Sequence, residues 1–128
     1  MHTRLLMTSS AAIMAAAGLA ATFLPQEILS RFAAAPTTDA VLLLQLLGAL
    51  YLGFAMLNWM ARGNLLGGIY SRPIALGNFV HFAVVAIALS KAVARGADAP
   101  RLVAATLYLA FAAWFGLVVF THPDKAAG

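Results

Sequence analysis

The chain has 128 residues, of which 63% are hydrophobic and 9% charged, with a formal net charge of +4 and no cysteine. Soluble domains carry about a quarter charged residues, so the composition excludes an ordinary soluble enzyme. The lack of cysteine excludes disulfides, thiolate metal sites and thiol redox chemistry. Because the basic residues flank apolar runs and do not cluster with aromatic residues, they favour contact with lipid headgroups over binding to nucleic acid.

Four uncharged apolar runs organise the sequence, at residues 5–24, 40–61, 73–90 and 102–121. A helix needs about 20 residues to cross the roughly 30 Å hydrocarbon core of a bilayer. A helix also satisfies its own backbone N–H and C=O groups where water is absent. We therefore predict an all-α fold, a four-helix transmembrane bundle that forms a single domain over residues 1–128. An even number of spans places both termini on one side of the membrane.

The first run, 5–24, is rich in alanine and contains Gly18. Small residues allow two helix backbones to approach closely in a membrane. This face could serve tight packing inside one bundle or an interface between subunits. The run is longer than the roughly 7–15 residues of a signal-peptide core, so we interpret it as a true first span.

Residues 25–35 predict a short amphipathic helix that lies in the membrane interface between the first two spans. Pro25 suits the first turn of a helix, and Ile28, Leu29 and Phe32 share one face. Such a helix can lie flat with its apolar face in the headgroup region. The following residues, Thr37, Thr38 and Asp39, are of the types that cap a helix start.

Two pairs of small residues predict close helix association. They are Ala49 with Gly53 in the second span and Ala112 with Gly116 in the fourth, each four residues apart on one helix face. The link at 62–72 is rich in glycine, which permits tight backbone turns. We expect a compact loop there, so the second and third spans should be antiparallel neighbours.

Five polar residues of the second and third spans form the candidate site. The spacing of Tyr51, Asn58 and Arg62 puts them on one helix face, and Asn78 and His81 share a face of the next helix. Polar residues inside membrane spans are costly and are functional candidates. Because the two spans should be antiparallel neighbours, we predict one polar pocket that opens toward the 62–72 link, with His81 deepest.

The same residues also permit a structural role, because Asn and His side chains hydrogen-bond neighbouring helices in membrane bundles. A bis-histidine haem site is disfavoured, since His122 lies at the edge of its span and His81 about 12 Å deep at 1.5 Å per residue. A zinc site lacks cysteine or acidic ligands near His81. All four acidic residues lie outside the apolar runs. We therefore predict no catalytic residue and no metal ligand, and the sequence assigns no cofactor.

Three segments resemble a family of small, uncharacterised bacterial four-span integral membrane proteins. They are FLPQEILS at 23–30, GALYLGFAMLNW at 48–59 and RPIALGNFVHF at 72–82. The general pattern is also similar to the broader DoxX-like membrane proteins, some of which are linked to quinone redox systems. The resemblance implies a four-helix fold and carries over no functional residue.

These observations predict a small, non-enzymatic integral membrane subunit that associates with itself or serves as an accessory to a larger membrane complex. A second hypothesis is a binding protein or redox partner for a lipophilic small molecule, such as a quinone or lipid, held near His81. A third is an oligomeric channel or carrier. The expected partners are the lipid bilayer and other membrane helices, without nucleic acid. The resemblance and the basic flanks favour a bacterial inner membrane, with both termini in the cytoplasm.

Overall fold

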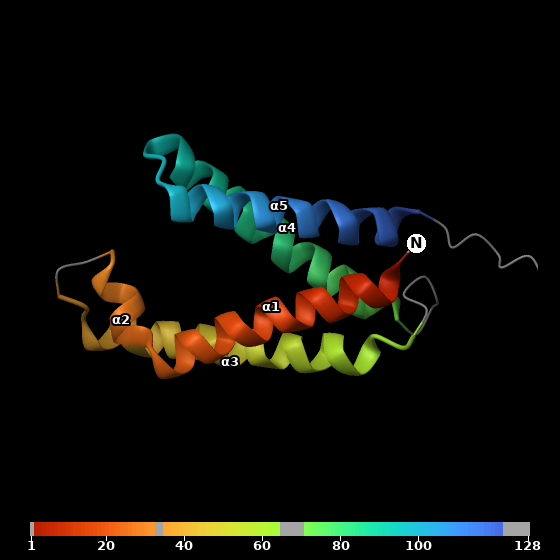
Figure 1. The fold of residues 1–128 in the computed structure, drawn as a ribbon, viewed down its shortest axis with the longest axis horizontal. Coiled ribbons are helices and arrows are strands. Elements are labelled where there is room, and N and C mark those ends of the chain that lie inside the picture. Colours follow the sequence, from red (N-terminus) through yellow and green to blue (C-terminus); the bar gives the residue numbers. More distant parts are fainter. Residues whose placement is uncertain (1, 33–34, 65–70, 122–128) are drawn as a thin grey trace, which may run out of the picture. The chain divides into compact units, whose positions relative to one another are not determined.

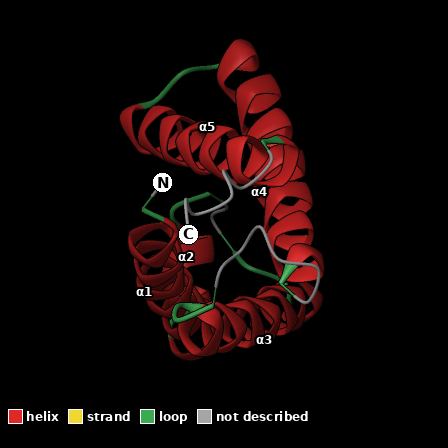
Figure 2. Cartoon of the chain, turned by 90° about the vertical axis from the view of Figure 1, so that its right-hand side faces the viewer, coloured by secondary structure: helices red, strands yellow, loops and turns green. Residues whose placement is uncertain are grey.

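The computed structural model describes residues 2–32, 35–64 and 71–121, and this part of the chain forms helices and no strand (Figures 1 and 2). The predicted all-α class is confirmed. Four long helices have the length and apolar composition to cross a membrane. Their 21 to 24 residues give about 32–36 Å at 1.5 Å per residue, enough for a roughly 30 Å core. The helices are α1 (Thr3–Phe23), α2 (Pro25–Ser30), α3 (Thr38–Ala61), α4 (Arg72–Arg95) and α5 (Ala99–Phe120).

The short helix α2 is where the predicted boundaries differ most from the structure. Its helical hydrogen bonds end at Ser30, and the chain tightens into a turn in which the Phe32 N–H donates to the Leu29 carbonyl at 2.9 Å. The prediction that the helix continues to residue 35 was therefore too long, and residues 33–34 lie outside the described part. The predicted cap of α3 is confirmed, because Thr37 Oγ1 accepts a hydrogen bond from the Ala40 N–H at 3.2 Å.

Helices α4 and α5 are joined by a short link at residues 96–98. Helix α4 continues to Arg95, one turn beyond the apolar run that ends at Ser90. The Gly96 N–H then closes the helix by bonding the carbonyls of Ala92 and Val93. Asp98 caps α5, since its Oδ1 accepts from the Arg101 N–H at 2.8 Å.

The chain divides into two compact units. The N-terminal unit, Met7–Arg62, contains most of α1 with α2 and α3. The C-terminal unit, Gly63–Gly128 with Met1–Leu6, contains α4 and α5. Within the first unit α1 runs beside α3, and within the second α4 runs beside α5 (Figures 1 and 2). The predicted glycine-rich loop at 62–72 falls mostly on residues 65–70, which are outside the described part.

In the N-terminal unit, α1 and α3 meet backbone to backbone at two glycines. A Cβ built on Gly48 would lie 2.6 Å from Thr22 Oγ1 and 3.0 Å from the Gly18 carbonyl oxygen. A Cβ built on Gly18 would lie 2.9 Å from Leu52 Cγ and 3.0 Å from the Gly48 carbonyl oxygen. A residue larger than glycine at either position would therefore clash with the backbone of the opposite helix.

The predicted small-residue contacts are confirmed in part. A Cβ built on Gly53 would meet no atom within 4 Å, and both Gly53 and Ala49 are exposed. The structure shows no contact at Gly53 among the described residues, because Gly48 faces α1 and Gly53 lies five residues away on another side of α3. Helix association through Ala49 and Gly53, in the bundle or in an oligomer, stays a prediction. The expectation for α5 is confirmed, since Ala112 is buried and a Cβ on Gly116 would lie 3.1 Å from Phe79 Cε2.

In the C-terminal unit, aromatic rings join α4 to α5. Phe82 is 1% exposed and stacks against two rings of α5, with centroids 4.9 Å from Phe111 and 5.6 Å from Phe115. Phe79 meets Phe120 edge to face at 5.4 Å. Such pairs contribute about 0.5–1.5 kcal/mol each beyond the area that they bury. Helix packing in the C-terminal unit therefore relies on large aromatic side chains, whereas helix packing in the N-terminal unit relies on glycines that let the backbones approach.

We predict that Gly48→Ala destabilises the protein by about 1–3 kcal/mol, because the new methyl group has no space between two backbones. The matched control is Gly63→Ala, which adds the same methyl group just beyond the end of α3, where a Cβ would meet no atom within 4 Å, and should change the stability by no more than about 0.5 kcal/mol. Thermal unfolding in detergent measures both variants. Equal melting temperatures for the two would contradict the close contact.

Candidate functional site

The polar site of the N-terminal unit is a chain of hydrogen bonds between α3 and α1. Asn58 Nδ2 donates to Ser10 Oγ at 3.1 Å, and the Ser10 hydroxyl donates to the Met7 carbonyl at 3.1 Å. Met14 Sδ lies 3.8 Å from the same amide nitrogen. Asn58 and Ser10 are fully buried. The Asn58 amide therefore links the two helices in the interior of the unit.

The predicted polar face of α3 is present. Tyr51 and Asn58 are both buried, on the stripe that also includes Gly48, Ala55 and Ala61. The spacing of three and four residues that suggested a common face is the spacing of the residues turned toward the interior. Arg62, one turn beyond Asn58, is partly exposed, and its guanidinium lies 3.8 Å above the Trp59 ring.

The two remaining candidates, Asn78 and His81, lie on α4 in the C-terminal unit. Asn78 is fully buried, and its Nδ2 donates to the Ile74 carbonyl of its own helix at 2.9 Å. The His81 ring is partly buried beside two aromatic rings, 5.2 Å from Phe82 and 6.1 Å from Tyr108 between centroids. The immediate surroundings of His81 in this unit are thus aromatic.

The five candidate residues are divided between the two units. Tyr51, Asn58 and Arg62 belong to the first unit, and Asn78 and His81 to the second. The common pocket expected for all five stays a prediction. Sequence reasoning missed Ser10 as the partner of Asn58. A serine in a helix can satisfy its hydroxyl on a preceding carbonyl, so nothing local marks it as a contact between helices.

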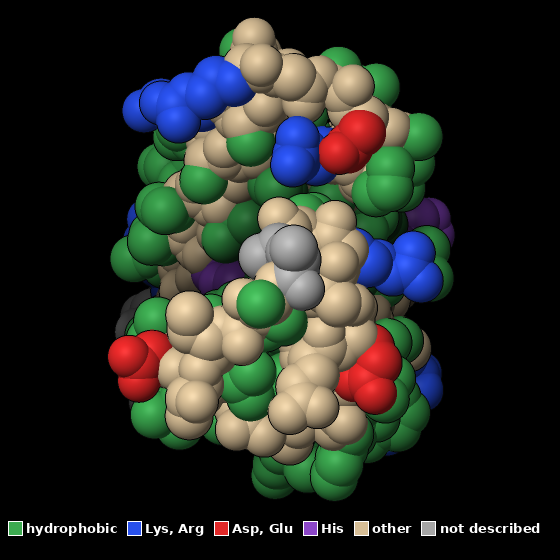
Figure 3. Space-filling view, turned by 90° about the vertical axis from the view of Figure 1, so that its left-hand side faces the viewer, with side chains coloured by type: hydrophobic (Ala, Val, Ile, Leu, Met, Phe, Trp, Pro, Cys, Tyr) green, Lys and Arg blue, Asp and Glu red, His purple; other side chains and the backbone are tan. Residues whose placement is uncertain are grey.

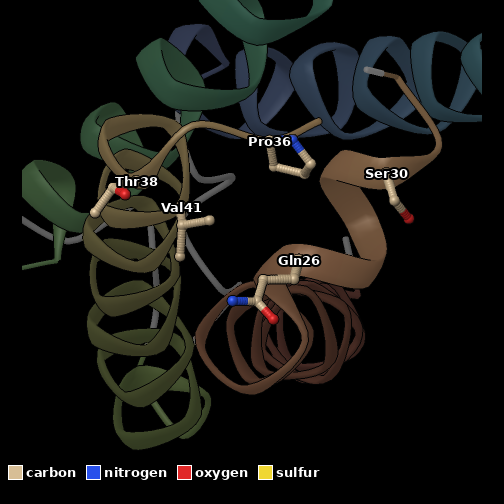
Figure 4. A pocket seen from close by; sticks show the side chains of 5 residues that line it. All are labelled: Gln26, Ser30, Pro36, Thr38 and Val41. Atoms are coloured by element: carbon tan, nitrogen blue, oxygen red, sulfur yellow. The ribbon is translucent and has the colours of Figure 1, made fainter. Parts of the chain in front are cut away.

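A pocket of about 420 Å³ lies elsewhere, between α2 and the start of α3 (Figure 4). Its lining side chains are short or uncharged: Gln26, Ser30, Pro36, Thr38 and Val41. None of them titrates near neutral pH, so the pocket offers hydrogen bonds but no acid or base. It opens where the chain passes from one span to the next, a position that the sequence did not single out as a site.

The described residues offer no metal centre, because no three His, Asp or Glu side chains gather closely enough to hold an ion. In the same part of the chain the acidic residues are Glu27, Asp39 and Asp98. All three are in or beside helix ends rather than in the apolar middle of a long helix. What the arrangement can do chemically is therefore to hydrogen-bond and to pack.

Fold and site together define a multi-pass, all-α membrane protein. Its buried Asn58 side chain bonds Ser10 of another helix, and its buried Asn78 side chain bonds a carbonyl of its own helix. No family model, curated protein or solved structure matches this chain. The assignment of a function therefore depends on the residues themselves.

We predict that Ser10 and Asn58 are energetically coupled. In a double-mutant cycle with Ser10→Ala and Asn58→Ala, the coupling should be about 0.6 kcal/mol and at most about 1.7, the range of hydrogen bonds between membrane helices. The measurement is reversible unfolding in mixed micelles.

The control cycle pairs Ser10→Ala with Gln45→Ala. Gln45 lies 13 residues from Asn58 on α3, about 20 Å along the helix at 1.5 Å per residue. That pair should be additive within about 0.3–0.5 kcal/mol. Additivity in both cycles would mean that the 3.1 Å contact contributes nothing to stability.

Proposed function

We propose that this protein is a small integral membrane subunit that works by associating with other transmembrane helices and has no enzymatic role. The associating helix belongs to a second copy of the chain or to a larger complex that the chain accompanies. The observation that carries the proposal is the exposed small-residue face of α3, formed by Ala49 and Gly53 and defined here as the α3 groove, where a Cβ on Gly53 would meet no atom of the described residues within 4 Å.

Packing within the described part of the chain does not explain the glycine of the α3 groove. Glycine destabilises a helix interior by about 1 kcal/mol relative to alanine, and the intrachain packing that explains Gly48 does not explain Gly53. Larger side chains border the groove, with Leu50 64% exposed and Met56 60% exposed. Small residues framed by larger ones let a second helix approach closely, and van der Waals contact is what drives helix association in lipid.

The exposure of α3 supports the same proposal. Only 11% of its apolar window is buried, against 39% for α1. Helix α3 therefore presents the largest share of unburied apolar residues of the four candidate spans. The buried polar residues are meanwhile engaged in structural bonds, Asn58 with Ser10 and Asn78 with the Ile74 carbonyl.

The experiment is native mass spectrometry of the protein released from mild detergent, which reports copy number, partner subunits and bound small molecules together. We predict an assembly of more than one chain, and Gly53→Leu should weaken it because the leucine fills the groove. The matched control is Ala113→Leu, a similar substitution at an exposed position of α5. A monomer without a partner, or equal loss of assembly in both variants, would contradict the proposal.

A second candidate function is favoured by the aromatic surroundings of His81. A histidine beside Phe82 and Tyr108 could hydrogen-bond the carbonyl of a flat lipophilic ligand, such as a quinone, while the rings pack against it. The same mass spectra test this candidate. An adduct of quinone mass that is present in the native protein and lost in His81→Gln would support ligand binding and displace the assembly proposal as the main role.

We further propose that the protein resides in a bacterial cytoplasmic membrane with both termini in the cytoplasm. The numbers of Lys and Arg on the two faces are equal, at four each. The N-terminal amine and the three acidic residues at the opposite helix ends, Glu27, Asp39 and Asp98, favour this orientation.

The cysteine-free sequence makes this orientation directly measurable. Single variants His2→Cys, Ala97→Cys and Gly128→Cys can be treated in intact spheroplasts with a maleimide that does not cross membranes. We expect labelling of Ala97→Cys alone, and of the two terminal variants only after lysis. Labelling of both termini in intact spheroplasts would reverse the orientation, and labelling of one terminus would contradict an even number of spans.

A further inference from the structure

The end of α3 carries a guanidinium that the structure holds in place. Arg62 Cζ lies 3.8 Å above the centre of the Trp59 ring, and Nη1 donates to the Trp59 carbonyl at the last turn of the helix. An arginine has five N–H donors in a planar fork. One face of the fork is thus covered by the indole and one donor is bonded, and no other described residue accepts a hydrogen bond from Arg62.

The residues beside this arginine are of the kinds found where a bilayer meets water. Trp59 is 49% exposed, and tryptophan concentrates at the level of the lipid headgroups. The neighbouring Met60 is 73% exposed and apolar, which suits the edge of the hydrocarbon core. In the described part of the chain no carboxylate pairs with Arg62, since the ion pair found there joins Arg101 to Asp98.

The charge at this end of α3 is positive. Residues 58–64 contain Arg62 and no Asp or Glu. The described acidic residues lie in the first turns of α2 and α3 and just before α5, and Figure 3 shows acidic as well as basic side chains on the face that it draws. A positive charge with no acidic residue beside it in the sequence attracts anionic headgroups.

We infer that the Arg62–Trp59 end of α3 binds the phosphate group of an acidic phospholipid. Phosphate accepts two parallel N–H bonds from a guanidinium. The contact with Trp59 fixes the plane of the fork before the lipid arrives, so less side-chain entropy is lost on binding. The exposed flank of α3 lies beside the acyl chains of the same lipid. Headgroup charge and apolar surface therefore recognise one molecule together.

The test is native mass spectrometry of the full chain from micelles that contain equal amounts of phosphatidylglycerol and phosphatidylcholine with the same acyl chains. The wild-type protein should retain phosphatidylglycerol preferentially. Arg62→Ala should lower that preference about fivefold, as expected for a basic residue worth about 1 kcal/mol at an anionic surface. Arg62→Lys keeps the charge but not the planar fork, and should fall between the two.

The matched control is Arg95→Ala, which removes an exposed arginine from the last turn of α4, where no aromatic ring stacks on it in the described residues. The preference for phosphatidylglycerol should be unchanged in this variant. Equal retention of the two lipids by the wild-type protein would overturn the inference. So would an equal loss in Arg95→Ala and Arg62→Ala, because net charge alone would then account for the binding. Both arginines lie at the surface, so a matching thermal melt shows that each variant is folded.

Discussion

The backbone contact between α1 and α3 sets the register on which the N-terminal unit depends. Gly18 and Gly48 can touch in only one alignment of the two antiparallel helices, because a neighbouring turn would place larger side chains between the backbones. The same alignment brings Ser10 opposite Asn58. A slip of one turn would leave the Asn58 amide buried without that bond, and an unsatisfied polar group in an apolar interior costs several kcal/mol. Close packing and polar satisfaction therefore select the same register.

The two units pack their helices together in opposite ways. The N-terminal unit removes side chains where helices meet, whereas the C-terminal unit fills the contact with Phe82, Phe111 and Phe115. Glycine contacts allow short distances between backbones and weak C–H hydrogen bonds between helices. Aromatic contacts tolerate greater spacing and add directional ring interactions. A small residue also contributes to the packing of α4 against α5, since the absence of a side chain at Gly116 leaves space for the Phe79 ring.

Much of the fold follows from the sequence because it is dictated locally. The lengths of the apolar runs, the cap at Thr37 and the common face of Tyr51 and Asn58 all depend on residues a few positions apart. The choice between Gly48 and Gly53 does not. Both glycines lie in the same apolar run, and only the position of α1 decides which of them is covered. The partner of Asn58 was missed for the same reason, because Ser10 is 48 residues away and its depth depends on the register.

The short link between α4 and α5 has a consequence for how the protein folds. Only residues 96–98 separate the two helices, and both sides of the turn are closed by local bonds from Gly96 and Asp98. Closing so short a loop costs little entropy, and contacts between near neighbours in sequence form quickly. The last two long helices can therefore pair with each other early in folding, as a helical hairpin whose formation depends on the three-residue segment between them.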